Sequence, residues 1–317
     1  MHEEVINSLK KSKDYLSGEE ISRSLNISRA AIWKNIEELR KKGYEIEAAS
    51  HKGYRLLSTP DKILPWEIKY KLNTRQIGKR IICKERVDST MDEAFRLGFE
   101  GAEEGTVVCA EAQTKGRGRM GRSWSSPKEV GVYMSLILRP TLSPRNVAKL
   151  TLLVAVAVCE ALRKVSGLDI KIKWPNDLLV HGKKLVGILT ELSAEVDRVK
   201  FVVVGLGVNV NAPQKKLPDE GTSLKIETKK KFVRVDVIKE ILRSLDAWYG
   251  LMKKEGFHPI FSQWKKYASM LKKKIFVRNG EETIEGIALD LSEEGGLLVQ
   301  KEDGKIIKIL AGDISII

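Results

Sequence analysis

The segment from Gly116 to Trp124 has the residue types of an anion-binding loop. Three glycines and three arginines alternate within the seven residues 116–122, and a tryptophan follows two positions later. Glycine lets the backbone approach a ligand closely, and the planar guanidinium of arginine pairs well with carboxylates and phosphates. We therefore expect this loop to wrap around a small anion.

Two nucleotide-binding motifs match this loop in spacing only. Gly116, Gly118 and Gly121 satisfy the G-x-G-x-x-G spacing, and residues 116–123 are one residue away from a P-loop, with Arg122 in place of the lysine. Both motifs require a helix directly after the loop. Residues 123–127 are Ser-Trp-Ser-Ser-Pro, which does not favour a helix. On the loop alone, a solvated basic surface segment also remains open.

Other segments carry polar groups that can join the loop in one site. Hydroxyl and amide side chains, which suit a neutral polar ligand group, stand at Ser89, Thr90 and Gln113, and further polar groups follow strands at Asn176-Asp177 and Lys183-Lys184. Taken singly, these residues have simpler interpretations. Ser89-Thr90 is also a typical helix cap, Asp177 a typical loop residue, and Trp174 is expected in the core.

Composition limits the class of protein. A chain of 317 residues with 42% hydrophobic residues can form two or three domains. No apolar run is long enough to span a bilayer, no secretory signal starts the chain, and Cys83, Cys109 and Cys159 lack metal-ligand spacing. We therefore expect reduced thiols, a cytoplasmic location and no membrane partner.

The net charge of +14 is weak evidence for nucleic acid because of where it lies. Residues 1–60 hold 11 Lys/Arg against 9 Asp/Glu, a net of +2. Much of the excess is in the lysine runs 229–231 and 272–274, which are typical of solvated surface.

Residues 1–60 have the pattern of a winged helix-turn-helix domain. Ser17 with Glu20 is a capping box, Ser28 caps a further helix with an apolar face, and two short strands surround the turn at Lys52-Gly53. The recognition helix is expected from about Ser28 to Lys42, with Arg29, Lys34 and Asn35 as DNA contacts. A protein-interaction module is the alternative for this small helical domain.

The rest of the chain predicts an α+β domain and a small β domain. Between residues 65 and 268 the strands do not alternate regularly with helices, which favours a mainly antiparallel sheet. Strands are expected at 81–87, 106–110, 132–138, 170–173, 185–192 and 201–210, and long helices at 147–165 and 235–254. Residues 270–317 contain short strands separated by turns, including Asn279-Gly280, and predict an SH3-like barrel.

The order of the motifs resembles the biotin protein ligase family, in its three-domain form that is both ligase and biotin-operon repressor. The matching segments are Ser89-Thr90, 113–119 (QTKGRGR), 173–177 (KWPND), 184–189 (KLVGIL) and 205–211 (GLGVNVN). Together with the two flanking domains, the resemblance covers nearly the whole chain. It implies a central domain similar to class II aminoacyl-tRNA synthetases, which joins biotin to ATP and passes biotin to a lysine of a biotin carboxyl carrier protein.

The resemblance also implies roles for individual residues. Biotin would be held by Ser89, Thr90, Gln113, Gly116, Arg117, Gly118, Arg119 and Lys184, and the nucleotide by Arg119, Arg122, Trp124, Asn176 and Asn209. Met91 departs from members that carry asparagine. Lys184 and Arg119 would be catalytic because the biotin carboxylate and the α-phosphate repel each other and need neutralising charge. Asp177 would help deprotonate the acceptor lysine or place the Mg²⁺ that accompanies ATP, with no dedicated metal site.

Two hypotheses of function follow. In the first, the chain is a biotin ligase that, with the adenylate bound, forms a homodimer on operator DNA and represses transcription. In the second, it is a transcription factor that senses a small acid without turnover.

Overall fold

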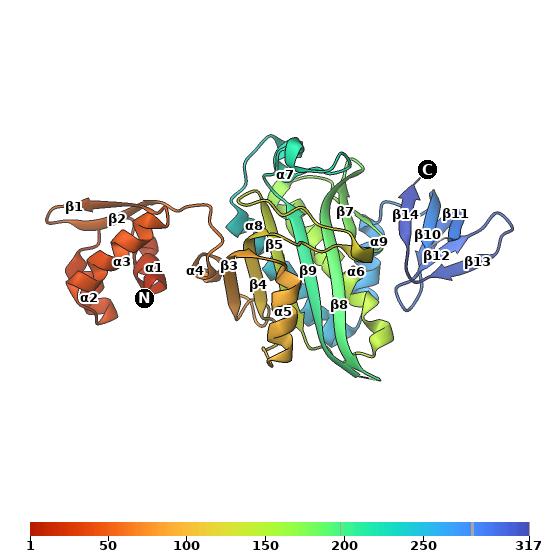
Figure 1. Ribbon diagram of the computed structural model, residues 1–317, viewed down its shortest axis with the longest axis horizontal. Coiled ribbons are helices and arrows are strands. Elements are labelled where there is room, and N and C mark those ends of the chain that lie inside the picture. The colour runs from red at the N-terminus through yellow and green to blue at the C-terminus, as the bar shows by residue number, and fades with distance from the viewer. Residues whose placement is uncertain (197, 280–281, 317) are drawn as a thin grey trace. The chain divides into compact units, whose positions relative to one another are not determined.

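Residues 1–196, 198–279 and 282–316 are described by a computed structural model, in which the chain divides between Lys62 and Ile63. We call Met1–Lys62 the small unit and Ile63–Ile317 the large unit. The predicted turn at Asn279-Gly280 lies outside the described residues at Gly280. Figure 1 shows the elements of each unit.

The small unit consists of three helices and an antiparallel hairpin, which agrees with the predicted winged helix-turn-helix pattern. Its elements are α1 (His2–Lys11), α2 (Gly18–Leu25), α3 (Arg29–Lys41), β1 (Glu45–Ala49) and β2 (Gly53–Ser58). Both halves of the capping box between Ser17 and Glu20 form, and the Ser28 hydroxyl accepts the Ala31 N–H at 3.2 Å. These caps fix where α2 and α3 begin. The apolar faces of the helices are buried, as Ile21 and Ile36 show.

A seven-stranded sheet forms the centre of the large unit. Its strands are β3 (Ile81–Val87), β4 (Val107–Gln113), β5 (Gly131–Leu138), β6 (Lys171–Lys173), β7 (Asp177–Val180), β8 (Lys183–Glu195) and β9 (Arg198–Asn209). Their order is β3-β4-β5-β9-β8-β7-β6, and only β3 and β4 pair in parallel. The predicted α+β class with a mainly antiparallel sheet is therefore confirmed.

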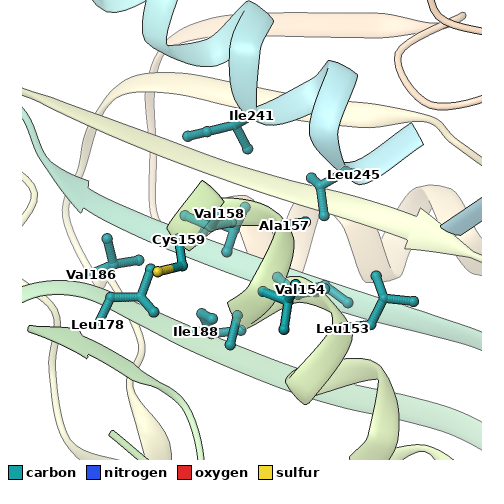
Figure 2. Close-up of a cluster of buried hydrophobic side chains, with 14 of the residues drawn as sticks. Leu153, Val154, Ala157, Val158, Cys159, Leu178, Val186, Ile188, Ile241 and Leu245 are labelled. Atoms are coloured by element: carbon teal, nitrogen blue, oxygen red, sulfur yellow. The ribbon is translucent and has the colours of Figure 1, made fainter. Parts of the chain in front are cut away.

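Helices cover both faces of this sheet. On one face α6 (Ala148–Ser166) lies against the strands, with α8 (Arg234–Glu255) and α9 (His258–Tyr267) packed on it. Figure 2 shows α6 side chains such as Val154 and Cys159 between strand residues such as Val186 and the α8 residues Ile241 and Leu245. On the other face lies α5 (Thr90–Phe99), while α4 (Pro65–Lys69) and α7 (Leu224–Thr228) are single turns. The sequence interpretation included α6 and α8 but missed α9 and β7.

A buried ion pair fixes the start of the large unit. Arg234 is fully buried, and its Nη1 lies 2.6 Å from Glu111 Oε2. The other carboxylate oxygen, Oε1, accepts the Ile63 backbone N–H at 2.7 Å. Strand β4, which ends at Gln113, is thus tied to the first residue of the unit.

The C-terminal part is a five-stranded antiparallel sheet. Its strands β10 (Lys274–Asn279), β11 (Glu282–Leu291), β12 (Leu297–Gln300), β13 (Ile306–Ile309) and β14 (Asp313–Ile316) follow the order β13-β12-β11-β10-β14. The indole N–H of Trp174 donates to the Gly295 carbonyl at 3.2 Å, so this sheet is hydrogen-bonded to the rest of the unit. Trp174 is 2% exposed and belongs to the core, as expected.

No helix within the described ranges combines the length and apolar character needed to cross a membrane.

Candidate active site

One cleft in the large unit gathers most of the predicted site residues. It lies where β4 ends and α5 begins, below the loop that joins β4 to β5. Its lining includes Ser89, Thr90, Gln113, Arg117, Gly118, Arg119, Arg122, Trp124, Asn176, Asp177 and Lys184. Asn209 lies outside this lining, in an adjoining pocket that Trp124 and Lys184 share. Gly116 lines neither cavity, and its backbone is hydrogen-bonded to Trp124.

The β4–α5 side of the cleft is a fixed chain of hydroxyl and amide groups. Ser89 caps α5 by accepting the Met91 N–H, while the Thr90 backbone N–H and hydroxyl both donate to Gln113 Oε1, at 2.8 and 3.0 Å. Gln113 Nε2 donates to Ser126 Oγ at 2.7 Å, and Ser135 donates to Thr90 Oγ1 at 2.8 Å. Ser89 and Thr90 are therefore helix-cap residues and cleft residues at once. Such a preorganised network suits a neutral polar group.

Sequence reasoning missed Ser126 and Ser135. Ser135 is fully buried in the mainly apolar strand β5, and a serine within such a strand is the signal that could have identified it.

The two ends of the glycine-arginine loop run side by side and are hydrogen-bonded to each other. Trp124 N donates to Gly116 O at 2.8 Å, and Gly118 N donates to Arg122 O at 2.7 Å. A Cβ on Gly116 would lie 2.4 Å from the Trp124 carbonyl oxygen, so glycine is required there for the close approach. Only a 3₁₀ turn, Arg119–Gly121, occurs in the loop, and strand β5 follows it. No α-helix lies between these two elements, so the loop lacks the helix that both nucleotide-binding motifs require.

The Trp124 indole lies on a floor made of glycines from two neighbouring strands. A Cβ on Gly187 would lie 2.7 Å from the Trp124 ring atom Cζ3, and one on Gly207 would lie 2.3 Å from Cε2 and Nε1. Lys184 Nζ lies 5.5 Å from the ring centroid. The indole N–H is buried without a hydrogen-bond partner among the described residues. An unpaired buried donor of this kind favours a ligand acceptor beside it.

Lys184 and Asp177 form the charged floor of the cleft. Lys184 Nζ lies 2.8 Å from Asp177 Oδ1, and both side chains are partly buried. The backbone of Lys184 accepts the Thr222 N–H at 2.9 Å, which ties the lysine to the segment before α7. Within α7, Glu227 lies 2.8 Å from the ring of His181, which is on the β7–β8 turn, and also accepts the Thr222 hydroxyl.

Arg119 and Arg122 reach the C-terminal sheet. Arg119 donates to Asn176 Oδ1 at 2.8 Å and to the Gly312 carbonyl at 3.3 Å, and Asp313 Oδ1 lies 3.7 Å from its guanidinium. Arg122 makes an ion pair with the same Asp313. Burial lowers the pKa of the Arg119 guanidinium, and nearby Asp313 opposes that shift. Asp313 is a cleft residue that the sequence interpretation missed, because nothing in the last strand resembles a ligand-binding motif.

Arg117 makes ion pairs with two carboxylates at the rim of the cleft. Its guanidinium lies 2.9 Å from Glu191 and 3.2 Å from Asp92. Both carboxylates compete with any anionic ligand for this arginine.

The three predicted DNA contacts on α3 differ in accessibility. Arg29 and Lys34 are exposed. Asn35 is only 6% exposed, and its amide donates to the Ala31 carbonyl at 2.8 Å. The predicted contact of Asn35 with a base would require its side chain to leave this hydrogen bond with its own helix.

No cluster of three or more His, Cys, Asp or Glu side chains suited to a metal occurs in the part of the chain that the structure describes. The cleft lining includes the carboxylate of Asp177, and Mg²⁺ is commonly held by one or two carboxylates together with substrate phosphates. The residues present therefore fit an ion that arrives with a nucleotide.

Comparison with known proteins gives the class that this fold and cleft define. Residues 83–209 match the Biotin/lipoate A/B protein ligase family, residues 2–55 an HTH domain, and residues 274–316 the Biotin protein ligase C terminal domain. The chain belongs to the biotin protein ligase family.

Two curated relatives match almost end to end. The Bifunctional ligase/repressor BirA of Bacillus subtilis is 44% identical over 307 residues, which cover 96% of this chain and 94% of that protein. The protein of the same name from Escherichia coli is 31% identical over 311 residues, 96% of this chain and 93% of that protein. Among solved structures, the biotin protein ligase from Aquifex aeolicus in complex with biotin and ATP superposes with a TM-score of 0.65. It is 32% identical, over 75% of this chain and 99% of that one.

Proposed function

We propose that this chain is a biotin–[acetyl-CoA-carboxylase] ligase that also acts as a transcriptional repressor. The observation that carries the enzymatic part is the single cleft that combines the Thr90–Gln113 network with the cations Lys184 and Arg119. The Thr90–Gln113 network suits a neutral polar ring. Lys184 and Arg119 suit two anionic groups, a carboxylate and a phosphate, that must come close to react. This is the combination that the activation of biotin by ATP requires.

The first step forms biotinyl-5′-adenylate. A biotin carboxylate oxygen attacks the α-phosphorus of ATP, a new P–O bond forms, and the bond to the departing pyrophosphate breaks. Lys184 and Arg119 reduce the repulsion between the carboxylate and the phosphate and stabilise the charge that develops at phosphorus. Mg²⁺ arriving with ATP would be held by the substrate phosphates, with Asp177 as the proposed protein ligand, and would screen the charge of the pyrophosphate. Holding both reactants in one cleft removes part of the entropic barrier.

In the second step the amine of an acceptor lysine attacks the carbonyl carbon of the mixed anhydride. An amide forms, AMP leaves, and the amine loses a proton. Ser89, Thr90, Gln113, Gly116, Arg117 and Gly118 are proposed for the biotin side, and Arg122, Trp124, Asn176 and Asn209 for the nucleotide side. The unpaired indole N–H of Trp124 supports its place against the adenylate. The acceptor is the biotin carboxyl carrier protein.

Two roles are proposed for Asp177, and Mg²⁺ dependence separates them. As a base it would take the proton from the acceptor lysine, so Asp177→Asn would slow transfer and leave adenylation intact. As a ligand of the ion it would raise the Mg²⁺ concentration that adenylation needs. Its ion pair with Lys184 supports a position beside the reacting groups.

The test is incubation with biotin, α-labelled ATP and Mg²⁺, followed by mass spectrometry of an added acceptor domain. Labelled adenylate and a biotinylated acceptor lysine are expected. Activation of lipoate and not biotin would overturn the substrate, and tight binding without acceptor modification would favour the sensor without turnover.

Lys184→Ala provides a sharper test of the charged floor. Removing one preorganised charge should slow adenylation on the order of 100-fold. Lys183→Ala is the matched control because Lys183 is the exposed neighbour, and its rate should stay within about twofold. Equal rates for the two variants would contradict the role of Lys184.

The repressor function is supported by the winged helix of the small unit, on which we propose Arg29 and Lys34 as contacts to operator DNA. We further infer a homodimer when the adenylate is bound, with two helices α3 on two half-sites. Operator affinity should rise with biotin plus ATP, and because linkage is reciprocal the operator should tighten adenylate binding by the same factor. Equal DNA affinity with and without the substrates would rule out this switch.

Three structural predictions also remain proposals. They are domains at 1–60, 65–268 and 270–317, a central domain similar to class II aminoacyl-tRNA synthetases, and an SH3-like barrel at the end. The five-stranded antiparallel sheet is compatible with the last. The free cysteines, of which Cys109 and Cys159 are buried and Cys83 is partly exposed, support a proposed cytoplasmic location.

A further inference from the structure

The outward side of α3 carries a large apolar side chain that no element of the small unit covers. Trp33 is 60% exposed, whereas Ile32 and Ile36 on the inward face are fully buried. Ala30, three residues before Trp33, and Lys34, four residues after Ala30, are also exposed. Residues three and four apart are surface neighbours on a helix, so these side chains form one patch.

Isolated exposed apolar residues are common and need no explanation, so the position of Trp33 is what matters. In a helix-turn-helix the second helix enters the major groove, and its N-terminal residues contact base edges. Helix α3 begins at Arg29, so Trp33 is its fifth residue and lies within that contacting region.

The charges along α3 complement DNA at this end of the helix. Arg29 and Lys34, which flank Trp33, are exposed cations. The acidic residues Glu37 and Glu38 come one turn later, each paired with a cation further along, at 2.7 and 2.8 Å. The first half of α3 is therefore the part that a phosphate backbone can approach without repulsion.

With Asn35 buried against its own helix, the exposed part of this region offers cations and apolar groups for recognition. We propose that Trp33 inserts into the major groove of the operator and contacts the 5-methyl groups of thymines, which makes it a sequence-determining residue. This proposal rests on the proposed repressor function. The thymine methyl is the apolar group on the base edges of the major groove, and an indole supplies a large rigid surface with few rotatable bonds.

The proposal divides the work on α3 between two kinds of contact. Lys34 and Arg29 reach phosphates, which position the protein and carry no sequence information. Lys34→Ala should therefore weaken all sequences alike and lower the salt dependence of binding. Trp33→Ala should leave the salt dependence unchanged and remove a preference for thymine.

The experiment uses the full chain with biotin, ATP and Mg²⁺ on a pool of random duplex DNA. Wild type should enrich a two-part motif, and Trp33→Ala a motif that has lost defined thymines. Duplexes of the wild-type motif are then made with deoxyuridine at those positions, which deletes only the methyl groups. This change should weaken wild type roughly tenfold, as a lost base contact does, and should have no further effect on Trp33→Ala. Leu57→Ala is the matched control, since Leu57 is 55% exposed in the same unit but lies on β2.

The outcomes separate this proposal from the function on which it rests. Undiminished thymine preference in Trp33→Ala overturns the proposal alone. A Trp33→Ala variant that weakens all sequences equally, or that dimerises less in sedimentation, assigns the indole to protein packing and also overturns it. If wild type enriches no sequence, the repressor function fails together with this proposal. Acceptor biotinylation and the thermal midpoint, measured for each variant, should stay at wild-type values.

Discussion

Replacing Gly207 with alanine should disable the cleft by displacing Trp124. The added Cβ would lie 2.3 Å from indole atoms Cε2 and Nε1, about 1.2 Å closer than an ordinary contact of about 3.5 Å. Gly207 lies near the end of β9 but is paired on both sides, to Tyr133 on β5 and to Gly187 on β8, so the strand cannot move aside easily. The Trp124 indole must therefore move away from Gly187 and Gly207.

A displacement of about 1 Å in a site that positions reactants can cost on the order of 100-fold in rate, equivalent to about 2.7 kcal/mol. We expect that loss in kcat/KM for adenylate formation, measured by release of labelled pyrophosphate. Overpacking should also lower the free energy of unfolding by about 1–3 kcal/mol. Gly250→Ala is the matched control. Gly250 has open space around its Cβ position and lies within α8, so alanine should keep full activity and stabilise the helix slightly.

A double-mutant cycle tests whether the effect passes through the indole. In a Trp124→Ala background the new methyl group meets no ring, so Gly207→Ala should change the rate by no more than about threefold. The same loss in both backgrounds would refute the reasoning, and so would full activity of the single variant.

Two further predictions concern charges outside the reacting groups. Glu111→Gln replaces a carboxylate partner of the fully buried Arg234 with a neutral amide and should destabilise the large unit by about 1–3 kcal/mol; an unchanged free energy of unfolding in denaturant would contradict this. Burial raises the pKa of Glu227, but hydrogen bonds from Thr222 and His181 outweigh it, and the net pKa lies below the usual value. A carboxyl group whose pKa is lowered by folding stabilises the protein at a pH above the usual pKa of glutamate, and this stabilisation is lost as the pH falls. The difference in thermal midpoint between wild type and Glu227→Gln should therefore shrink from pH 7 to pH 4. A difference that grows in acid would reverse the assigned sign.

The sequence could predict those parts of the fold whose patterns are local. The caps at Ser17 and Ser28 and the apolar strands of the sheet depend on neighbouring residues, and these elements are confirmed. The pocket residues were found by motif, although no motif shows that Ser89 serves both as helix cap and as cleft wall.

The rest could not be predicted because it depends on contacts between distant segments. Asp313 meets the loop arginines only through the docking of two sheets. Asn35 has the residue type of a base contact, and only the packing of the helices shows that it is buried. The exposure of Trp33 was missed for the same reason.

The contact between Arg119 and the Gly312 carbonyl spans 193 residues and has a consequence for synthesis on the ribosome. The small unit is complete within residues 1–62, so it can fold as soon as that segment emerges, as N-terminal domains generally do. The cleft must wait until β14 has been made. A growing chain thus holds a folded winged helix for most of its synthesis, before the loop arginines have their carboxylate partner. Translation arrested before residue 313 would leave a folded winged helix on a chain whose cleft lacks Asp313, the partner of Arg119 and Arg122.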